Sequence, residues 1–172
     1  MKRRLVTATA VLLIAAFAAW QQEPWGSGGS DLPAGRDEVV RVVDGDTVEL
    51  RSAGKSRLIG VDTPEVFGGR ECFGHEASAF AERVLPPGLR VRVERDVEER
   101  DRYGRMLVYL TLPDGRSFNE LLVAEGFAVP LTIPPNVRHS ERFAALARRA
   151  RERSAGLWST GACDGDPDRL VD

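Results

Sequence analysis

Short apolar runs alternate with polar turns through much of the chain. Residues 39–43 and 47–50 are rich in Val, Leu and Thr, and each run is followed by a turn signal such as Asp-Gly or Ala-Gly. Further runs of this kind lie at residues 57–61 and 106–112. In residues 89–94, apolar and charged positions alternate strictly, which is typical of a strand that buries one face. The pattern predicts five strands.

Three other segments repeat their apolar residues at helical spacing. Residues 75–84 place alanine, phenylalanine and valine on one face and stop before a Pro-Pro-Gly sequence. Ser117 followed by Glu120 is a capping-box pattern and predicts a helix over 118–125, and an apolar stripe predicts a last helix over 140–155. Five strands with about three helices predict a mainly β (α+β) fold, a Greek-key barrel of the OB-fold type.

The first residues have the layout of an export signal. Three basic residues precede an apolar run at 5–19, which is short for a membrane-spanning helix. We therefore expect residues 1–19 to be a signal peptide, with an uncleaved membrane anchor as the alternative. Residues 20–37 are rich in Gly, Ser, Pro and Gln, which predicts a flexible linker. One domain would then span 38–160, with a tail at 161–172.

Composition narrows the class of protein. The 172 residues are 42% hydrophobic and 29% charged, which fits one globular domain and excludes a disordered chain or a polytopic membrane protein. Basic and acidic residues number 24 and 26, and loss of residues 1–19 would leave 21 against 26. This acidic balance disfavours a protein that binds nucleic acid through a broadly basic surface. An anionic ligand would have to be held by local groups.

The chain has only two cysteines, Cys72 and Cys163. In an exported protein this even number predicts one disulfide, which would tie the C-terminal tail to a loop early in the domain. Two unrelated thiols are the alternative. A zinc site with His75 is disfavoured, because these three residues lack the close spacing of zinc ligands.

Three polar clusters stand at predicted loops: residues 44–47, Arg57 with residues 62–65, and residues 101–105. Each alone is also a plain turn signal. Taken in order, the segments VDGDTVEL, RLIGVDTPE, GHEASAF, DRYGR and NELLVAEGFA resemble the thermonuclease, or staphylococcal nuclease-like, family. The resemblance runs from about Val39 to Trp158.

The resemblance implies a nuclease that hydrolyses phosphodiester bonds of DNA and RNA with one bound Ca²⁺. The products would be 3′-phosphate and 5′-hydroxyl ends. Asp46 and Asp62 match the family's two carboxylate ligands of the metal, and Thr63 matches the residue that offers a backbone carbonyl. Oxygen donors of this kind are the ligands that Ca²⁺ prefers. Asp44 is interpreted as closing the turn.

The resemblance also implies the roles of the remaining site residues. Arg57 and Arg105 match the two arginines that hold the scissile phosphate, and Glu65 matches the general base. Arg102 and Tyr103 match a basic and an aromatic residue near the nucleotide. The chain departs from the family at two positions that often hold tyrosine, where Leu131 and Ile133 stand. Loss of stacking there predicts weaker binding of single strands.

The sequence therefore predicts an exported nuclease, either secreted or held in the cell envelope or periplasm. We expect a monomer whose contact with the membrane is transient, through the N-terminal segment, unless that segment remains as an anchor. The alternative function is a catalytically weak module of the same fold that binds nucleic acid or protein. The presence of Arg57, Glu65 and Arg105 together argues against that alternative.

Overall fold

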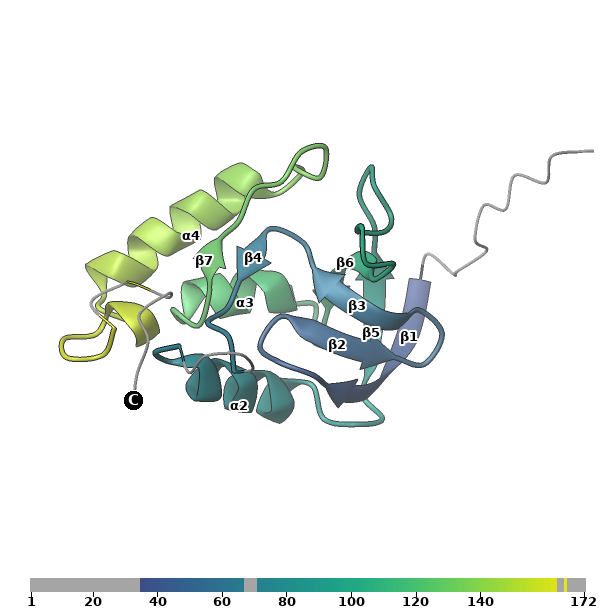
Figure 1. Cartoon of the computed structure of the whole chain (residues 1–172), viewed down its shortest axis with the longest axis horizontal. Helices are drawn as coiled ribbons and strands as arrows, with labels where there is room; N and C mark the ends of the chain where they lie inside the picture. The colour runs from purple at the N-terminus through teal and green to yellow at the C-terminus, as the bar shows by residue number, and fades with distance from the viewer. Residues whose placement is uncertain (1–34, 67–70, 164–165, 167–172) are drawn as a thin grey trace, which may run out of the picture. The chain divides into compact units, whose positions relative to one another are not determined.

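Five strands close into a barrel in the order β1-β2-β3-β6-β5 (Figure 1). The computed structural model describes residues 35–66, 71–163 and 166. Neighbouring barrel strands are antiparallel, except for the parallel pair β3 and β6. The predicted five-stranded barrel is confirmed. Its strands are β1 (Gly35–Val42), β2 (Thr47–Leu50), β3 (Gly54–Leu58), β5 (Arg90–Glu94) and β6 (Met106–Thr111).

Two strands begin earlier than the sequence predicted. β1 starts at Gly35, inside the segment expected to be a linker, because residues 35–38 pair with β5. β3 starts at Gly54 and not at residue 57, because Gly54 already pairs with Leu50 across a tight hairpin. The left-handed backbone of Gly54, with φ of +71°, lets the chain turn directly into the strand.

A second, two-stranded sheet was not predicted. β4 (Val61–Asp62) pairs with β7 (Val129–Pro130), so the expected strand at 57–61 is broken at Gly60. Gly60 has φ of +79°, and a Cβ there would lie 2.3 Å from the ring of Phe143. This break turns the chain out of the barrel just before Asp62.

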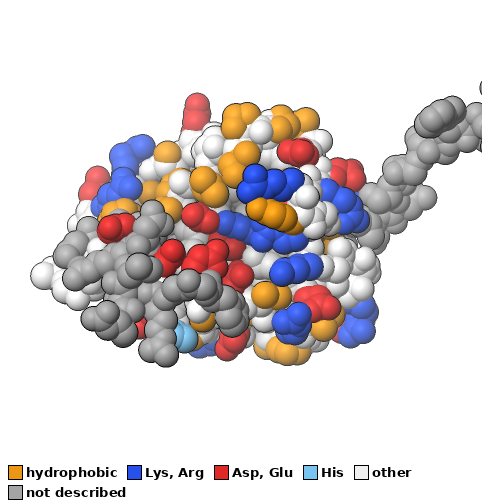
Figure 2. Space-filling model, viewed as in Figure 1, with side chains coloured by type: hydrophobic (Ala, Val, Ile, Leu, Met, Phe, Trp, Pro, Cys, Tyr) orange, Lys and Arg blue, Asp and Glu red, His pale blue; other side chains and the backbone are white. Residues whose placement is uncertain are grey.

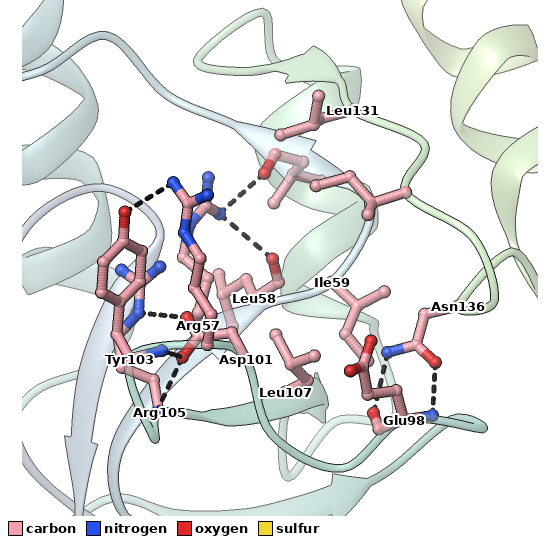
Figure 3. A pocket seen from close by; sticks show the side chains of 14 residues that line it. Arg57, Leu58, Ile59, Glu98, Asp101, Tyr103, Arg105, Leu107, Leu131 and Asn136 are labelled. Atoms are coloured by element: carbon pink, nitrogen blue, oxygen red, sulfur yellow. Dashed lines mark hydrogen bonds and ion pairs between the residues drawn. The ribbon is translucent and has the colours of Figure 1, made fainter.

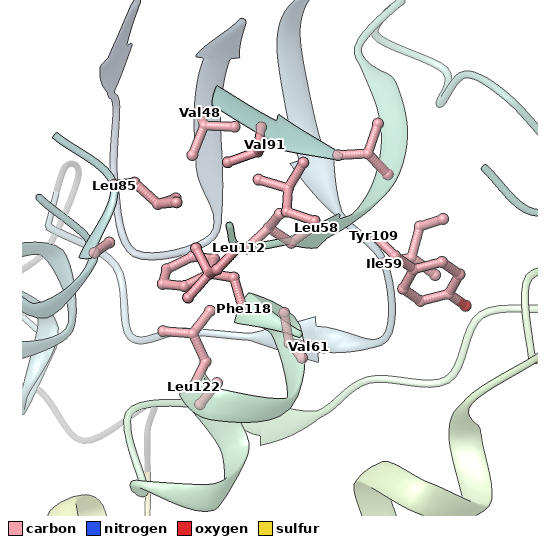
Figure 4. Packing of buried hydrophobic residues seen from close by; sticks show 14 of the residues in the cluster. Val48, Leu58, Ile59, Val61, Leu85, Val91, Tyr109, Leu112, Phe118 and Leu122 are labelled. Atoms are coloured by element: carbon pink, nitrogen blue, oxygen red, sulfur yellow. The ribbon is translucent and has the colours of Figure 1, made fainter. Parts of the chain in front are cut away.

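The described part of the chain has three α-helices: α2 (Gly74–Val84) and α3 (Phe118–Ala124), which pack on barrel strands, and α4 (Ser140–Glu152), which packs on α3 and β7. A 3₁₀ turn, η1 (Gly156–Trp158), follows α4. The predicted capping box is present, because the Ser117 hydroxyl accepts a hydrogen bond from the backbone N–H of Glu120 at 3.3 Å. α3 lies against β6 and α4, and Phe118 and Leu122 of α3 point into the apolar core (Figure 4).

The predicted disulfide joins Cys72 and Cys163, 91 residues apart. The two cysteines are therefore not separate thiols. Closing a loop of this length stabilises a fold by about 4 kcal/mol in the chain-entropy model. The bridge connects the loop before α2 to the chain that follows η1.

The segment predicted to be a signal peptide or anchor lies outside the described residues, as do most of the predicted linker and most of the tail. None of the helices in the described part is both long and apolar enough to cross a membrane.

Candidate active site

The loop between β1 and β2 carries the first acidic site residue, Asp46. Asp44 closes this loop, because its Oδ1 accepts a hydrogen bond from the backbone N–H of Asp46 at 3.2 Å. Gly45 permits a close approach to Thr63, since a Cβ at Gly45 would lie 2.6 Å from the Thr63 Oγ1. The glycine thus brings the loop against the segment after β4.

Asp46 is buried, with 5% of its surface exposed. Its Oδ2 accepts hydrogen bonds from the backbone N–H of Thr63 at 2.8 Å and from the Thr63 hydroxyl at 3.0 Å. Burial raises the pKa of Asp46 to about 7, and the carboxylates of Asp44 and Asp62 add to the increase, against the opposing charge of Arg57. The charged form of Asp46 is therefore costly to maintain with its protein partners alone.

Arg57, on β3, links Asp46 to Asp62. Its Nη2 lies 2.6 Å from Asp62 Oδ1 and 3.1 Å from Asp46 Oδ2. Its Nη1 donates to the carbonyls of Leu58 at 3.1 Å and Val61 at 2.7 Å. The structure thus places Arg57 between the two carboxylates expected to bind metal. The Asp62 side chain is 44% exposed, so it can turn away more readily than the buried Asp46.

The donors around Asp46 fit part of a site for a hard cation. Carboxylate oxygens from Asp46 and Asp62 both lie within 3.1 Å of one nitrogen of Arg57, and oxygen donors of this kind are the ligands that a hard cation prefers. Within residues 35–66, 71–163 and 166, no three acidic, histidine or cysteine side chains converge as a metal site would require. A cation here would need further oxygens from the backbone, water or substrate.

Glu65 follows β4 in an irregular segment. Its backbone N–H donates to the Glu71 Oε2 at 2.6 Å, and its carbonyl accepts from the Glu71 N–H at 3.3 Å. Burial raises the pKa of the Glu65 carboxyl, as do the charges of Asp44, Glu71 and Asp62, whereas Arg57 lowers it. A raised pKa makes Glu65 a stronger base. The contact with Glu71 carries no signal in the sequence and was not predicted.

Arg105 is held by Asp101, a member of the polar cluster at residues 101–105 for which no role was predicted. The Asp101 Oδ2 accepts from Arg105 Nε at 2.6 Å, and its Oδ1 accepts from the backbone N–H groups of Tyr103 and Arg105, each at 2.9 Å. Burial would raise the pKa of Asp101, but these hydrogen bonds and the charge of Arg105 outweigh it and lower the pKa. Asp101 accepts a hydrogen bond from the backbone N–H of the residue two positions later, which is an Asx turn. An aspartate at the start of a turn is the sequence signal that could have indicated this role.

The guanidinium of Arg105 lies over the ring of Tyr103, with its central carbon 5.5 Å from the ring centre. In the described part of the chain, neither Nη1 nor Nη2 donates a hydrogen bond. The Arg105 side chain is 27% exposed. Because Asp101 binds only Nε and the backbone N–H, the two-pronged end of the guanidinium remains available to an anion.

A cavity of about 490 Å³ brings Arg57 and Arg105 together (Figure 3). Arg102 and Tyr103 also line it, and the guanidinium carbon of Arg102 lies 4.8 Å from the centre of the Tyr103 ring. The remaining lining is mostly aliphatic. It comprises Leu58, Ile59, Gly60, Val61, Leu107, Leu131 and Ile133, with Glu98, Asp101 and Asn136.

The acidic residues Asp46, Asp62 and Glu65 and the neighbouring Thr63 do not line this cavity. They lie beside it, because Arg57 lines the cavity and also contacts Asp46 and Asp62. Figure 2 shows acidic side chains gathered next to basic ones on the face in view. The site therefore has an acidic part and a basic, partly apolar part, joined by Arg57. Such an arrangement can hold a cation and a phosphate side by side.

Comparisons with known proteins agree on one family. The family model described as "Staphylococcal nuclease homologue" matches residues 55–160. The thermonuclease of Staphylococcus hyicus is 35% identical over 90% of this chain and 95% of its own length. The thermonuclease of Staphylococcus intermedius is 37% identical, over 70% of this chain and 74% of its own. Endonuclease YncB of Bacillus subtilis is 33% identical over 69% of this chain and 59% of its own.

Proposed function

The chain belongs to the staphylococcal nuclease family and is a nuclease that hydrolyses phosphodiester bonds, and we propose that it cleaves both DNA and RNA and depends on Ca²⁺. The observation that carries the proposal is the position of Arg57. This residue contacts two carboxylates suited to a cation and lines the cavity that Arg105 also lines. A phosphate between the two arginines would therefore lie next to the cation site.

Arg105 and Arg57 bind the scissile phosphate in this proposal. The unused fork of Arg105 can hold two phosphate oxygens at once, and its grip strengthens as negative charge grows on the phosphate in the transition state. Arg57 differs from Arg105, because its terminal nitrogen Nη2 is already paired with Asp62. Its full contribution requires that Asp62, which is half exposed, give up this contact.

Asp46 and Asp62 would hold the Ca²⁺, together with the backbone carbonyl of Thr63. Bound there, the ion would neutralise both carboxylates, polarise a phosphate oxygen and leave Nη2 of Arg57 available to the phosphate, while Nη1 keeps its bonds to the carbonyls of Leu58 and Val61. The hydrogen bonds from Thr63 keep the buried carboxylate of Asp46 in one orientation. The Asp46 carboxylate is therefore already oriented before the cation binds.

Glu65 acts as the general base in this proposal. A carboxyl group with a raised pKa takes a proton from water more readily than an ordinary carboxylate does. The activated water attacks phosphorus, the bond from phosphorus to the 5′ oxygen breaks, and the leaving oxygen takes a proton from solvent. Cleavage on that side leaves a 3′-phosphate and a 5′-hydroxyl.

Export remains a proposal that rests on the N-terminal sequence alone. Basic residues followed by an apolar run support secretion or retention in the cell envelope or periplasm. The mass of the protein recovered from its source tests this. Loss of about two kilodaltons, the mass of residues 1–19, supports a cleaved signal, and an intact N-terminus supports a membrane anchor.

The test of the function uses the chain without residues 1–19, with single-stranded DNA, duplex DNA and RNA as substrates. We expect cleavage with Ca²⁺ and none with a chelator. The new 5′ ends should be labelled by a polynucleotide kinase without prior phosphatase treatment, because they carry hydroxyl groups. A folded protein that binds these nucleic acids but never cleaves them would favour the binding module.

A further inference from the structure

The contacts of Glu65 point to a support that is built from the loop before α2. Residues 71–74 lie directly on the backbone of Glu65. Glu71 makes two hydrogen bonds to it, and Gly74 approaches so closely that a Cβ there would lie 2.7 Å from the Glu65 carbonyl oxygen. Since Glu65 lies outside any helix or strand, these contacts hold it where a regular element does not.

The disulfide fixes this support to the rest of the domain. Cys72 follows Glu71 directly and is bonded to Cys163, which is fully buried. The ring of Phe73 stacks on Phe127 at 5.5 Å between centres, which adds a second attachment to the chain after α3. The loop before α2 is therefore attached to the rest of the domain by a covalent bond and by an aromatic contact.

We infer that Glu71 and the Cys72–Cys163 disulfide are positioning residues that hold Glu65 in its place for catalysis. The inference rests on the proposed function, in which Glu65 handles the attacking water. The two arginines proposed to bind the phosphate lie on β3 and in the turn before β6, and in the described part of the chain neither has a hydrogen bond or ion pair with residues 71–74. Loss of the support should therefore slow the chemical step and leave substrate binding unchanged.

The size of the effect follows from geometry. A displacement of about 1 Å at a catalytic group can cost a factor of about 100 in rate. We expect Glu71→Ala to lower kcat about tenfold to a hundredfold with little change in KM. Glu71→Gln should keep most of the turnover, because its amide oxygen can still accept the Glu65 N–H. Cys72→Ser with Cys163→Ser, and the wild-type enzyme after reduction, should behave like Glu71→Ala.

The experiment measures kcat and KM of these variants on single-stranded DNA, well below each melting temperature. Glu82→Ala is the matched control, because Glu82 is an exposed glutamate of α2, and it should keep full turnover. Glu71→Ala leaves the disulfide in place, so it tests the inference even if the serine double variant does not fold. A fall in melting temperature with unchanged kcat, in both Glu71→Ala and the serine variant, would overturn the inference.

A double-mutant cycle separates this inference from the proposed function. Glu71→Ala should cost little further turnover once Glu65→Gln has removed the carboxylate that it positions. If the two losses multiply instead, Glu71 does not act through Glu65 and the inference is wrong, while the proposed function stands. If Glu65→Gln keeps full turnover, the role of Glu65 fails, and the inference fails with it.

Discussion

Thr63 donates both its backbone N–H and its side-chain hydroxyl to the same carboxylate oxygen of Asp46, at 2.8 and 3.0 Å. The two residues are 17 positions apart and come from the loop before β2 and the segment after β4. Their contact fixes the distance between the two polypeptide segments that carry the proposed cation ligands. Thr63 therefore links the two segments of the acidic part of the site through both its backbone and its side chain.

We predict that Thr63→Val destabilises the protein. The substitution keeps the branched shape but removes the hydroxyl that binds a buried carboxylate, and a hydrogen bond to a charged group contributes about 1.5–3 kcal/mol. Urea unfolding measures the loss in the free energy of unfolding. Thr63→Ser keeps the hydroxyl and is the matched control. Equal stability of Thr63→Val and the wild type would show that this hydrogen bond does not hold Asp46.

Arg105→Lys should lower kcat by a factor of about 100 to 1,000, the usual cost of removing one donor that stabilises developing charge. Lysine keeps the positive charge but cannot grip two phosphate oxygens at once or keep the Nε contact with Asp101. The control is Arg100→Lys, because Arg100 lies near the same turn but does not line the cavity. Full activity of Arg105→Lys would make Arg105 a surface residue.

Part of the cavity wall is aliphatic, so we predict that aromatic residues placed there would strengthen the binding of single-stranded DNA. Replacing Leu131 and Ile133 together by tyrosine should lower KM for single-stranded DNA, since stacking contributes about 1–3 kcal/mol per base. The value of kcat should change little, because neither position is among the residues proposed to bind the phosphate or the cation. Val137→Tyr is the control, because Val137 is exposed but lies outside the cavity lining. An unchanged KM in the double variant would mean that no base stacks at these positions.

The barrel could be predicted because its strands follow simple rules. Val91 and Val93 alternate with charged residues, and such a pattern is fixed by which face is buried. The break at Gly60 could not be predicted in this way. It depends on the ring of Phe143, a residue of α4 that lies far away in sequence. The strand that was expected to end at residue 61 therefore became β3 and β4.

In the candidate site, too, some features could be predicted from the sequence and others could not. Its charged residues stand in short motifs, so Asp46, Arg57 and Arg105 could be named from the sequence alone. Their partners could not be found so easily. The carboxylate of Glu71 reaches the Glu65 backbone only because the intervening loop folds back, and no spacing rule describes that return. The pairing of Arg57 with both Asp46 and Asp62 likewise appears only in three dimensions.

Asp96 should contribute to stability in a pH-dependent way. Burial would raise its pKa, but hydrogen bonds from the Arg138 N–H and the Tyr109 hydroxyl, with the charge of Arg138, hold the pKa below its ordinary value of 3.8. A carboxyl group with a lowered pKa in the folded state stabilises the protein above pH 3.8. That contribution is lost as the pH falls through the folded-state pKa.

We therefore expect Asp96→Asn to be less stable than the wild type at pH 7, with the difference shrinking as the pH falls below 3.8. Urea unfolding across this range measures it. Asp114→Asn is the control, because Asp114 is half exposed and pairs with Arg116 at the surface, where an ion pair contributes little. A difference between Asp96→Asn and the wild type that stays constant down to pH 2 would contradict this account.

The most direct test of the central claim compares the wild type with Glu65→Gln on single-stranded DNA in Ca²⁺, with Glu82→Gln as the control. The substitution keeps the shape of Glu65 and its backbone contacts with Glu71 but removes the carboxylate proposed to act as the base. We predict unchanged binding of the DNA and a turnover lower by a factor of about 100 to 10,000, the usual contribution of general acid–base catalysis. Turnover equal to that of the wild type would contradict the account, because the chemistry would then not depend on Glu65.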